Sequence, residues 1–193
     1  MSSAIERLRQ TGLDLTDAVL EKIRNELQCD PDTLSAADLL LGLGLGDYDY
    51  DTGEWTPRSG EIYAFDAEIF DVDRMYTLFL QGVQAIVPDI RITDVREDLS
   101  QMTDEMTVPE DGLHPPTDGK RAVSFLCNGH AYSKELDSYG DWFNERMFSF
   151  MDEVLEKENC PFRLRHWNDM QFVFAIYGTK EKAEKIAALI EQD

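Results

Sequence analysis

The chain has 193 residues and a formal net charge of −21, because 39 Asp and Glu residues outnumber 18 Lys and Arg residues. A hydrophobic content of 42% is too high for a disordered acidic chain, and the length suits one domain or two small ones. The acids are spread over both halves of the sequence without any basic cluster. We therefore expect no nucleic acid and no membrane surface as partner, and the charge allows a basic protein, although many bacterial cytosolic proteins are acidic merely for solubility.

The sequence also favours a cytoplasmic protein. Residues 1–7 contain no apolar core of a signal peptide, and the apolar-rich run 39–46 is far shorter than a membrane-spanning helix. Cys29, Cys127 and Cys160 are an odd number at wide spacing. Such spacing is typical of thiols in a reducing compartment and not of a disulfide framework.

Residues 1–46 predict a helical N-terminal segment. Apolar residues recur within 4–28 at the spacing of an amphipathic helix. A second, short helix is expected to end at Gly42, with a flexible glycine-rich stretch after it. Residues 47–60 then predict a linker in the form of a hairpin that turns at 51–53.

Residues 61–193 predict an α+β domain, in which an antiparallel or mixed sheet carries helices on one face. A strand over 63–69, a helix over 72–87 and a strand over 90–94 give the order β-α-β. Residues 97–119 are acidic and contain adjacent prolines and two glycines. This composition predicts a long acidic surface loop.

The last third of the chain predicts the order β-β-α-β-β-α. Apolar residues alternate from Val123 to Cys127, and Asn128-Gly129 is the strongest short hairpin signal. The elements expected to follow are the returning strand 130–137, a helix over 139–158, strands over 162–166 and 171–177, and a helix from Thr179.

No common catalytic or nucleotide-binding motif occurs in the sequence. Gly-x-Ser-x-Gly, His-Glu-x-x-His and Gly-x-x-x-x-Gly-Lys are all absent. Gly42, Gly44 and Gly46 resemble a dinucleotide-binding loop, but Asp47 stands where that motif needs glycine, and a helix precedes the loop where the motif needs a strand. We therefore predict no catalytic residue and no cofactor.

Alternating aspartates at Asp47, Asp49 and Asp51 suggest oxygen ligands for calcium. An EF-hand loop that starts at Asp47 requires glycine at position 52 and glutamate at position 58. The chain has Thr52 and Arg58 there, so we interpret the aspartates as solvated turn residues.

Two cysteines and two histidines, Cys127 with His130 and Cys160 with His166, supply the side chains of a zinc site. The first pair brackets a tight hairpin turn, and Cys127 alternates with core positions. His166 shares the face of apolar strand residues, which favours a core or rim position. We therefore predict no metal site.

Tyr139, Trp142 and Trp167 are the candidate binding residues. Trp142 and Trp167 each stand beside charged neighbours in the sequence, and amphipathic aromatic side chains are frequent in protein interfaces. Core positions are the favoured interpretation for most aromatic residues of this part of the chain, and a binding surface is the alternative.

Two functional hypotheses follow. The first is a non-catalytic interaction protein, such as a bacterial antitoxin or immunity-type inhibitor, which uses its negative charge to attract a basic partner. The alternative is a small enzyme or small-molecule-binding domain with a carboxylate and His114 or His166 beside the 97–119 loop.

Overall fold

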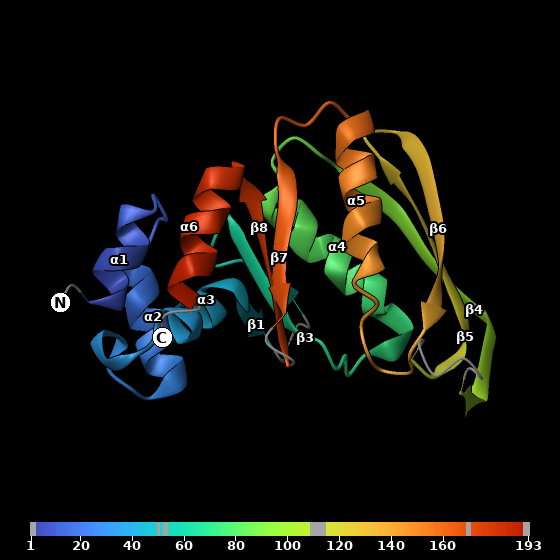
Figure 1. The fold of residues 1–193 in the computed structure, drawn as a ribbon, viewed down its shortest axis with the longest axis horizontal. Helices are drawn as coiled ribbons and strands as arrows, with labels where there is room; N and C mark the ends of the chain where they lie inside the picture. The colour runs from blue at the N-terminus through green and yellow to red at the C-terminus, as the bar shows by residue number, and fades with distance from the viewer. Residues whose placement is uncertain (1–2, 50, 52–53, 109–114, 169–170, 191–193) are drawn as a thin grey trace. The chain divides into compact units, whose positions relative to one another are not determined.

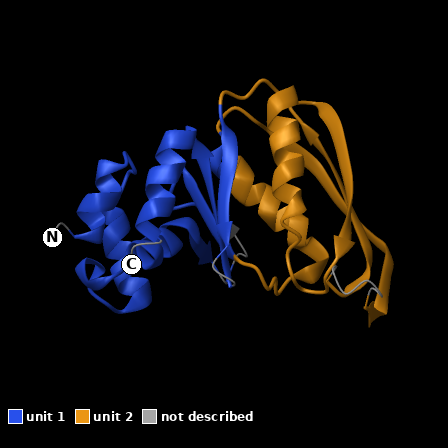
Figure 2. Cartoon of the chain, in the orientation of Figure 1, with its two compact units in different colours: residues 1–65, 85–87, 162–193 blue, residues 66–84, 88–161 orange. Residues whose placement is uncertain are grey.

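The structure is a computed structural model and describes residues 3–49, 51, 54–108, 115–168 and 171–190 (Figure 1). Within these residues it contains six α-helices and three antiparallel sheets, which confirms the predicted α+β class. From residue 62 onward the elements follow the predicted order. Figure 2 shows two compact units: unit 1 contains residues 1–65, 85–87 and 162–193, and unit 2 contains residues 66–84 and 88–161.

Unit 1 places helices on one face of a three-stranded sheet (Figure 1). The strand order is β3-β8-β7. The strands are β3 (Ile62–Asp66), β8 (Phe172–Gly178) and β7 (Arg163–Asn168). The helices are α1 (Ala4–Gln10), α2 (Asp17–Leu27), α3 (Ala36–Gly44) and α6 (Lys180–Ile190), with a short 3-10 turn η1 (Pro31–Thr33).

The core of unit 1 combines both ends of the chain. Leu8, Leu39 and Leu43 from the N-terminal helices pack in one cluster with Phe174 of β8 and Ile186 of α6. The N-terminal helices therefore have no core of their own. The compact units accordingly differ from the predicted boundaries 1–46, 47–60 and 61–193, because local periodicity does not show which distant strands pair.

Helix α3 extends to Gly44, so the prediction that it ends at Gly42 is wrong. The helix approaches strand β3 closely at this point. A Cβ atom on Gly44 would lie 2.6 Å from the Cβ atom of Ala64, which is too close for any other residue. The glycine therefore serves close packing and not flexibility.

The predicted hairpin within 47–60 is present as β1 (Asp47–Asp49) paired with β2 (Glu54–Thr56). Residues 52 and 53 of its expected turn lie outside the described residues. The side chain of Arg58 is only 4% exposed and lies 2.7 Å from Asp47 and 2.5 Å from Glu26. Its Nη1 also donates to the carbonyl of Gly42, at 2.6 Å. This segment is thus anchored on unit 1.

Unit 2 contains an antiparallel sheet of order β4-β5-β6, with helices α4 and α5 on one face (Figure 1). Asn128 and Gly129 form the predicted tight turn between β5 and β6, with φ values of 50° and 87°. The elements are η2 (Val72–Arg74), α4 (Met75–Ile86), β4 (Ile92–Thr107), β5 (Thr117–Cys127), β6 (His130–Ser138) and α5 (Arg146–Lys157).

The predicted surface loop over 97–119 is wrong for most of the described part. Strand β4 continues to Thr107, and β5 begins at Thr117, while 109–114 lie outside the described residues. Strand β4 is an edge of its sheet, and register shifts interrupt its pairing with β5. Charged side chains are common on edge strands, which explains why an acidic composition conceals a strand here.

Helix α5 begins at Arg146, later than the predicted start at 139. The preceding backbone pairs with residues 67–69 instead. The N–H of Ile69 donates to the carbonyl of Asp141 at 2.7 Å, and the N–H of Phe143 donates to that of Ala67 at 2.8 Å. These bonds occupy backbone groups that a longer helix would need for itself.

One buried ion pair connects the parts of unit 2. The guanidinium of Arg121 lies 3.1 Å from the carboxylate of Glu97, and these side chains are 1% and 3% exposed. Arg121 also donates to the carbonyl of Val72. Glu97 accepts from the N–H and the hydroxyl of Thr77, at 2.8 and 2.9 Å. The pair therefore fixes β4, β5 and the start of α4 to one another.

Replacing Glu97 by glutamine is expected to lower the free energy of unfolding by about 3–5 kcal/mol, because it leaves the buried charge of Arg121 without a counter-charge. Asp98→Asn, at the exposed neighbouring position, should leave the urea midpoint nearly unchanged. Urea unfolding followed by circular dichroism measures both variants. Equal midpoints for the two variants would contradict the assigned role of the pair.

Candidate functional site

The turn between β6 and α5 carries two of the three predicted binding residues, Tyr139 and Trp142. Gly140 has a φ of +69°, a conformation that favours glycine, and its N–H donates to Asp118 Oδ1 at 3.3 Å. The N–H of Trp142 donates to the carbonyl of Tyr139 at 3.2 Å. These bonds close the turn and bring the two aromatic residues together.

The backbone on both sides of Trp142 is held in place. Asp141 and Phe143 make the hydrogen bonds to residues 67–69 described above, and Trp142 itself forms a β-bridge with Glu68. Phe143 is 2% exposed, and its ring centre lies 5.6 Å from that of Tyr76. Trp142 nevertheless stays 38% exposed. The structure therefore presents this tryptophan at the surface on an ordered backbone.

Tyr139 and Trp142 line a surface hollow of about 500 Å³, which we call the aromatic hollow. Asn144, Glu145 and Arg146 supply its polar groups. Its apolar lining consists of Met106, Pro115, Pro116, Tyr139, Trp142 and Phe143.

Two exposed apolar side chains of unit 2 line this hollow, and two more stand near its segments in the sequence. Met106 and Trp142 line it, and Met106 is 49% exposed. Val108 follows Met106 in the chain and is 70% exposed. Phe70 is fully exposed and directly follows residues 67–69, which pair with the Trp142 segment. A group of exposed apolar residues is typical of an interaction site, whereas scattered ones are not.

The segments that form the aromatic hollow are strongly acidic. Residues 104–107, 115–118 and 137–146 contain six carboxylates, at Asp104, Glu105, Asp118, Asp137, Asp141 and Glu145. Their only cationic side chain is Arg146, which lies 3.7 Å from Asp137. The surroundings of the hollow therefore carry a negative charge that an incoming cationic group would compensate.

Trp167, the third predicted binding residue, does not join this site. It lies on β7 in unit 1, where it is partly buried against the unit 1 core. His166 is exposed on the same strand, against the expected core or rim position, and His114 lies outside the described residues. Met106 and the prolines at 115 and 116 were not predicted as site residues. In the sequence, the adjacent prolines indicate only a loop.

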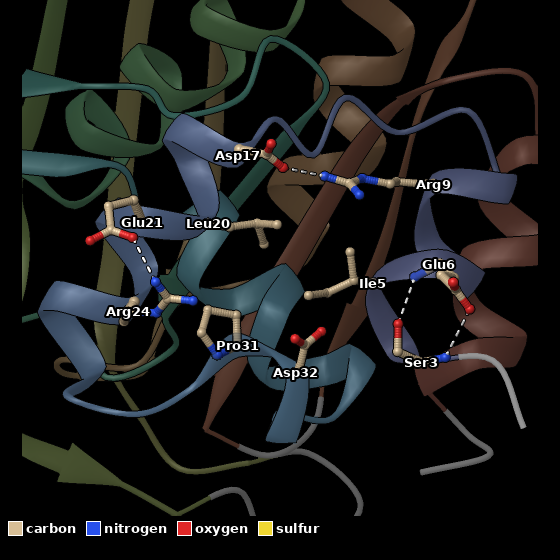
Figure 3. A pocket seen from close by; sticks show the side chains of 10 residues that line it. All are labelled: Ser3, Ile5, Glu6, Arg9, Asp17, Leu20, Glu21, Arg24, Pro31 and Asp32. Carbon is tan, nitrogen blue, oxygen red and sulfur yellow. Dashed lines mark hydrogen bonds and ion pairs between the residues drawn. The ribbon is translucent and has the colours of Figure 1, made fainter.

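A second hollow, of about 360 Å³, lies between α1, α2 and η1 in unit 1. Figure 3 shows Ile5, Leu20 and Pro31 between two arginines. Arg9 pairs with an aspartate at 3.0 Å, and Arg24 pairs with a glutamate at 2.8 Å (Figure 3). Local partners thus already compensate both guanidinium groups, and we assign no ligand to this hollow.

No three His, Cys, Asp or Glu side chains converge as metal ligands within the described parts of the chain. Cys127 is buried, and burial raises the pKa of its thiol to about 12. Burial would raise the pKa of Asp47, but hydrogen bonds from Lys22 and Arg58 outweigh it and lower that pKa. Asp47 therefore acts as a structural acceptor in unit 1.

Glu158, directly after α5, anchors the β5–β6 turn. Its side chain is 4% exposed and accepts hydrogen bonds from the hydroxyl of Tyr132 at 2.5 Å and from Asn128 Nδ2 at 3.1 Å. His130 Nδ1 lies 2.9 Å from the same carboxylate. The bond from Tyr132 lowers the pKa of Glu158, and the other two bonds contribute, so that together they outweigh the opposing effect of burial.

Comparison with protein-family models, with curated proteins and with solved structures finds no match to this chain. None of the helices in the described residues is both long and apolar enough to cross a membrane. Function therefore has to be inferred from the side chains and charges of the chain itself.

Glu158→Gln is expected to reduce stability near neutral pH, because it removes a carboxylate that the fold stabilises in its ionised form. Since the folded-state pKa of Glu158 lies below the usual 4.5, its contribution is present above pH 4.5 and disappears as the pH falls through the folded-state pKa. The stability curves of the wild type and the variant should therefore converge in acid.

Thermal unfolding at a series of pH values from 7 downward measures this convergence. Glu156→Gln, at an exposed position of α5, is the matched control. A constant difference between Glu158→Gln and the wild type at all pH values would contradict the inferred pKa.

Proposed function

We propose that this chain is a non-catalytic interaction module that binds a basic protein through the aromatic hollow. The observation that supports the proposal best is that exposed Trp142 and Met106 line a hollow together with Glu145 and Arg146, in segments whose sequence contains six carboxylates and one guanidinium. The partner would place an apolar side chain in the hollow and cationic side chains around it. An inhibitor or immunity-type protein of the bacterial cytoplasm would use such a surface.

The aromatic lining supports this proposal energetically. Trp and Tyr are enriched among the few residues that contribute most of the free energy of binding in protein interfaces. Because hydrogen bonds fix the backbone beside Trp142 before binding, less conformational entropy would be lost when a partner docks. The hollow is also of a size that accepts one large side chain.

The charge supports the choice of a basic partner. A net charge of −21 would accelerate the approach of a cationic protein, and the acids beside the hollow would orient it. The same field repels nucleic acid and anionic lipid. Rising salt concentration would therefore slow association, because salt screens exposed charges.

The alternative, an enzyme or a small-molecule site with a carboxylate and His114 or His166, has less support. His166 lies in unit 1, is exposed, and does not line the aromatic hollow. His114 is outside the described residues. We therefore place the interaction module first.

Trp142→Ala is expected to weaken binding to the partner by about 2 kcal/mol, or roughly 30-fold, because it removes the exposed anchor. The partner would first be identified by cross-linking in cells of the native host, and affinities then measured with purified proteins. Both the wild type and the variant should show the same melting temperature.

Trp167→Phe is the control, since Trp167 packs on the core of unit 1 and does not line the hollow. It should leave the affinity unchanged. If Trp142→Ala binds like the wild type, or if the partner carries a net negative charge, the proposal is wrong.

A further inference from the structure

We propose that a second hollow of unit 2, between β6 and α5, binds the phosphoryl group of a small molecule. This hollow has a volume of about 480 Å³, and we call it the lysine hollow. Its lining includes His130, Tyr132 and Lys134 from β6 and Phe150, Glu153 and Lys157 from α5. It is independent of the proposed partner surface.

Aromatic rings hold the two ammonium groups of the lysine hollow. Lys134 Nζ lies 5.6 Å from the ring centre of Phe150, and Lys157 Nζ lies 5.8 Å from that of Tyr132. These cation–π contacts restrict the position of each ammonium without neutralising its charge. The N–H groups that do not face a ring stay available to a ligand.

Neither ammonium has a carboxylate within 4.0 Å among the described residues. Glu153 stands four positions before Lys157 on α5, a spacing that often produces an ion pair. On α6 the same spacing produces an ion pair, in which Lys185 Nζ lies 2.8 Å from Glu181 Oε1. In a chain with 39 acids and 18 bases, two uncompensated lysines on one hollow indicate a site for an external anion.

His130 supplies a third polar group. Its Nδ1 faces the Glu158 carboxylate at 2.9 Å, and its side chain is 74% exposed. The bond at Nδ1 leaves Nε2 as the ring nitrogen for a ligand. Lysine binds phosphate as a point charge and does not require planar geometry, so two lysines and one imidazole suit a tetrahedral dianion.

Glu153 provides a charge change of opposite sign in the same hollow. Its carboxylate lines the same hollow and would repel an anion. Lys134→Gln and Lys157→Gln should each weaken phosphate binding, whereas Glu153→Gln should strengthen it. Charge alone predicts these opposite signs, so the anion is placed in this hollow by effects larger than that of a remote charge change such as Lys120→Gln.

The experiment titrates the full chain with inorganic phosphate and follows backbone amide shifts by NMR, with sodium chloride at equal ionic strength as reference. Each lysine variant is expected to weaken binding about threefold to tenfold, and Glu153→Gln to tighten it by about threefold. Lys120→Gln removes one positive charge from an exposed lysine of β5, which pairs with Glu135, and should change the affinity less than twofold.

A parallel titration with phenyl phosphate separates the two sources of a phosphoryl group. If phenyl phosphate binds more tightly than inorganic phosphate, the ligand is an organic phosphate ester, because Tyr132 and Phe150 would contact its ring. If the two probes bind with equal affinity, the ligand is free phosphate. If neither probe shifts the amides of 130–134, or if Lys120→Gln weakens binding as much as Lys134→Gln, the proposal is overturned. Failure of this site would not affect partner binding at Trp142, so the two proposals are tested separately.

Discussion

The buried ion pair between Arg121 and Glu97 connects β4, β5 and the start of α4 within unit 2. Two charges buried to this degree are tolerable only because each finds several partners. Arg121 reaches the carbonyl of Val72, and the chain just before Val72 contains residues 67–69, which pair with the backbone around Trp142. A contact inside the unit thus sets the position of the residue that we assign to partner binding.

Helix α5 connects the two candidate sites of unit 2. Its first residue, Arg146, lines the aromatic hollow, and its last residue, Lys157, lines the lysine hollow. Strand β6 relates the sites in the same way, since Tyr139 directly follows its end and His130 begins it. The two hollows differ in their charged groups, because acids collect beside the turn, whereas two lysines and one glutamate line the lysine hollow.

Elements that are fixed by neighbouring residues agree with the predictions, whereas elements that are fixed by residues distant in the sequence do not. The turn at Asn128-Gly129 and the order of elements follow from neighbouring residues. The start of α5 was misplaced because residues 141–143 pair with a segment from a different part of the sequence. Trp142 and Trp167 look alike in the sequence, and only tertiary packing places one at a hollow and the other on a core.

The acidic edge strand β4 has a consequence for encounters between identical molecules. Edge strands offer unpaired backbone groups to any other strand, and many proteins assemble or aggregate in this way. Asp98, Asp104 and Glu105 are exposed along this edge. Two copies that met edge to edge would bring these like charges together, whereas a cationic strand would meet none of that repulsion. Like charge along β4 thus opposes pairing of two copies at this edge, whereas it does not oppose a strand of opposite charge.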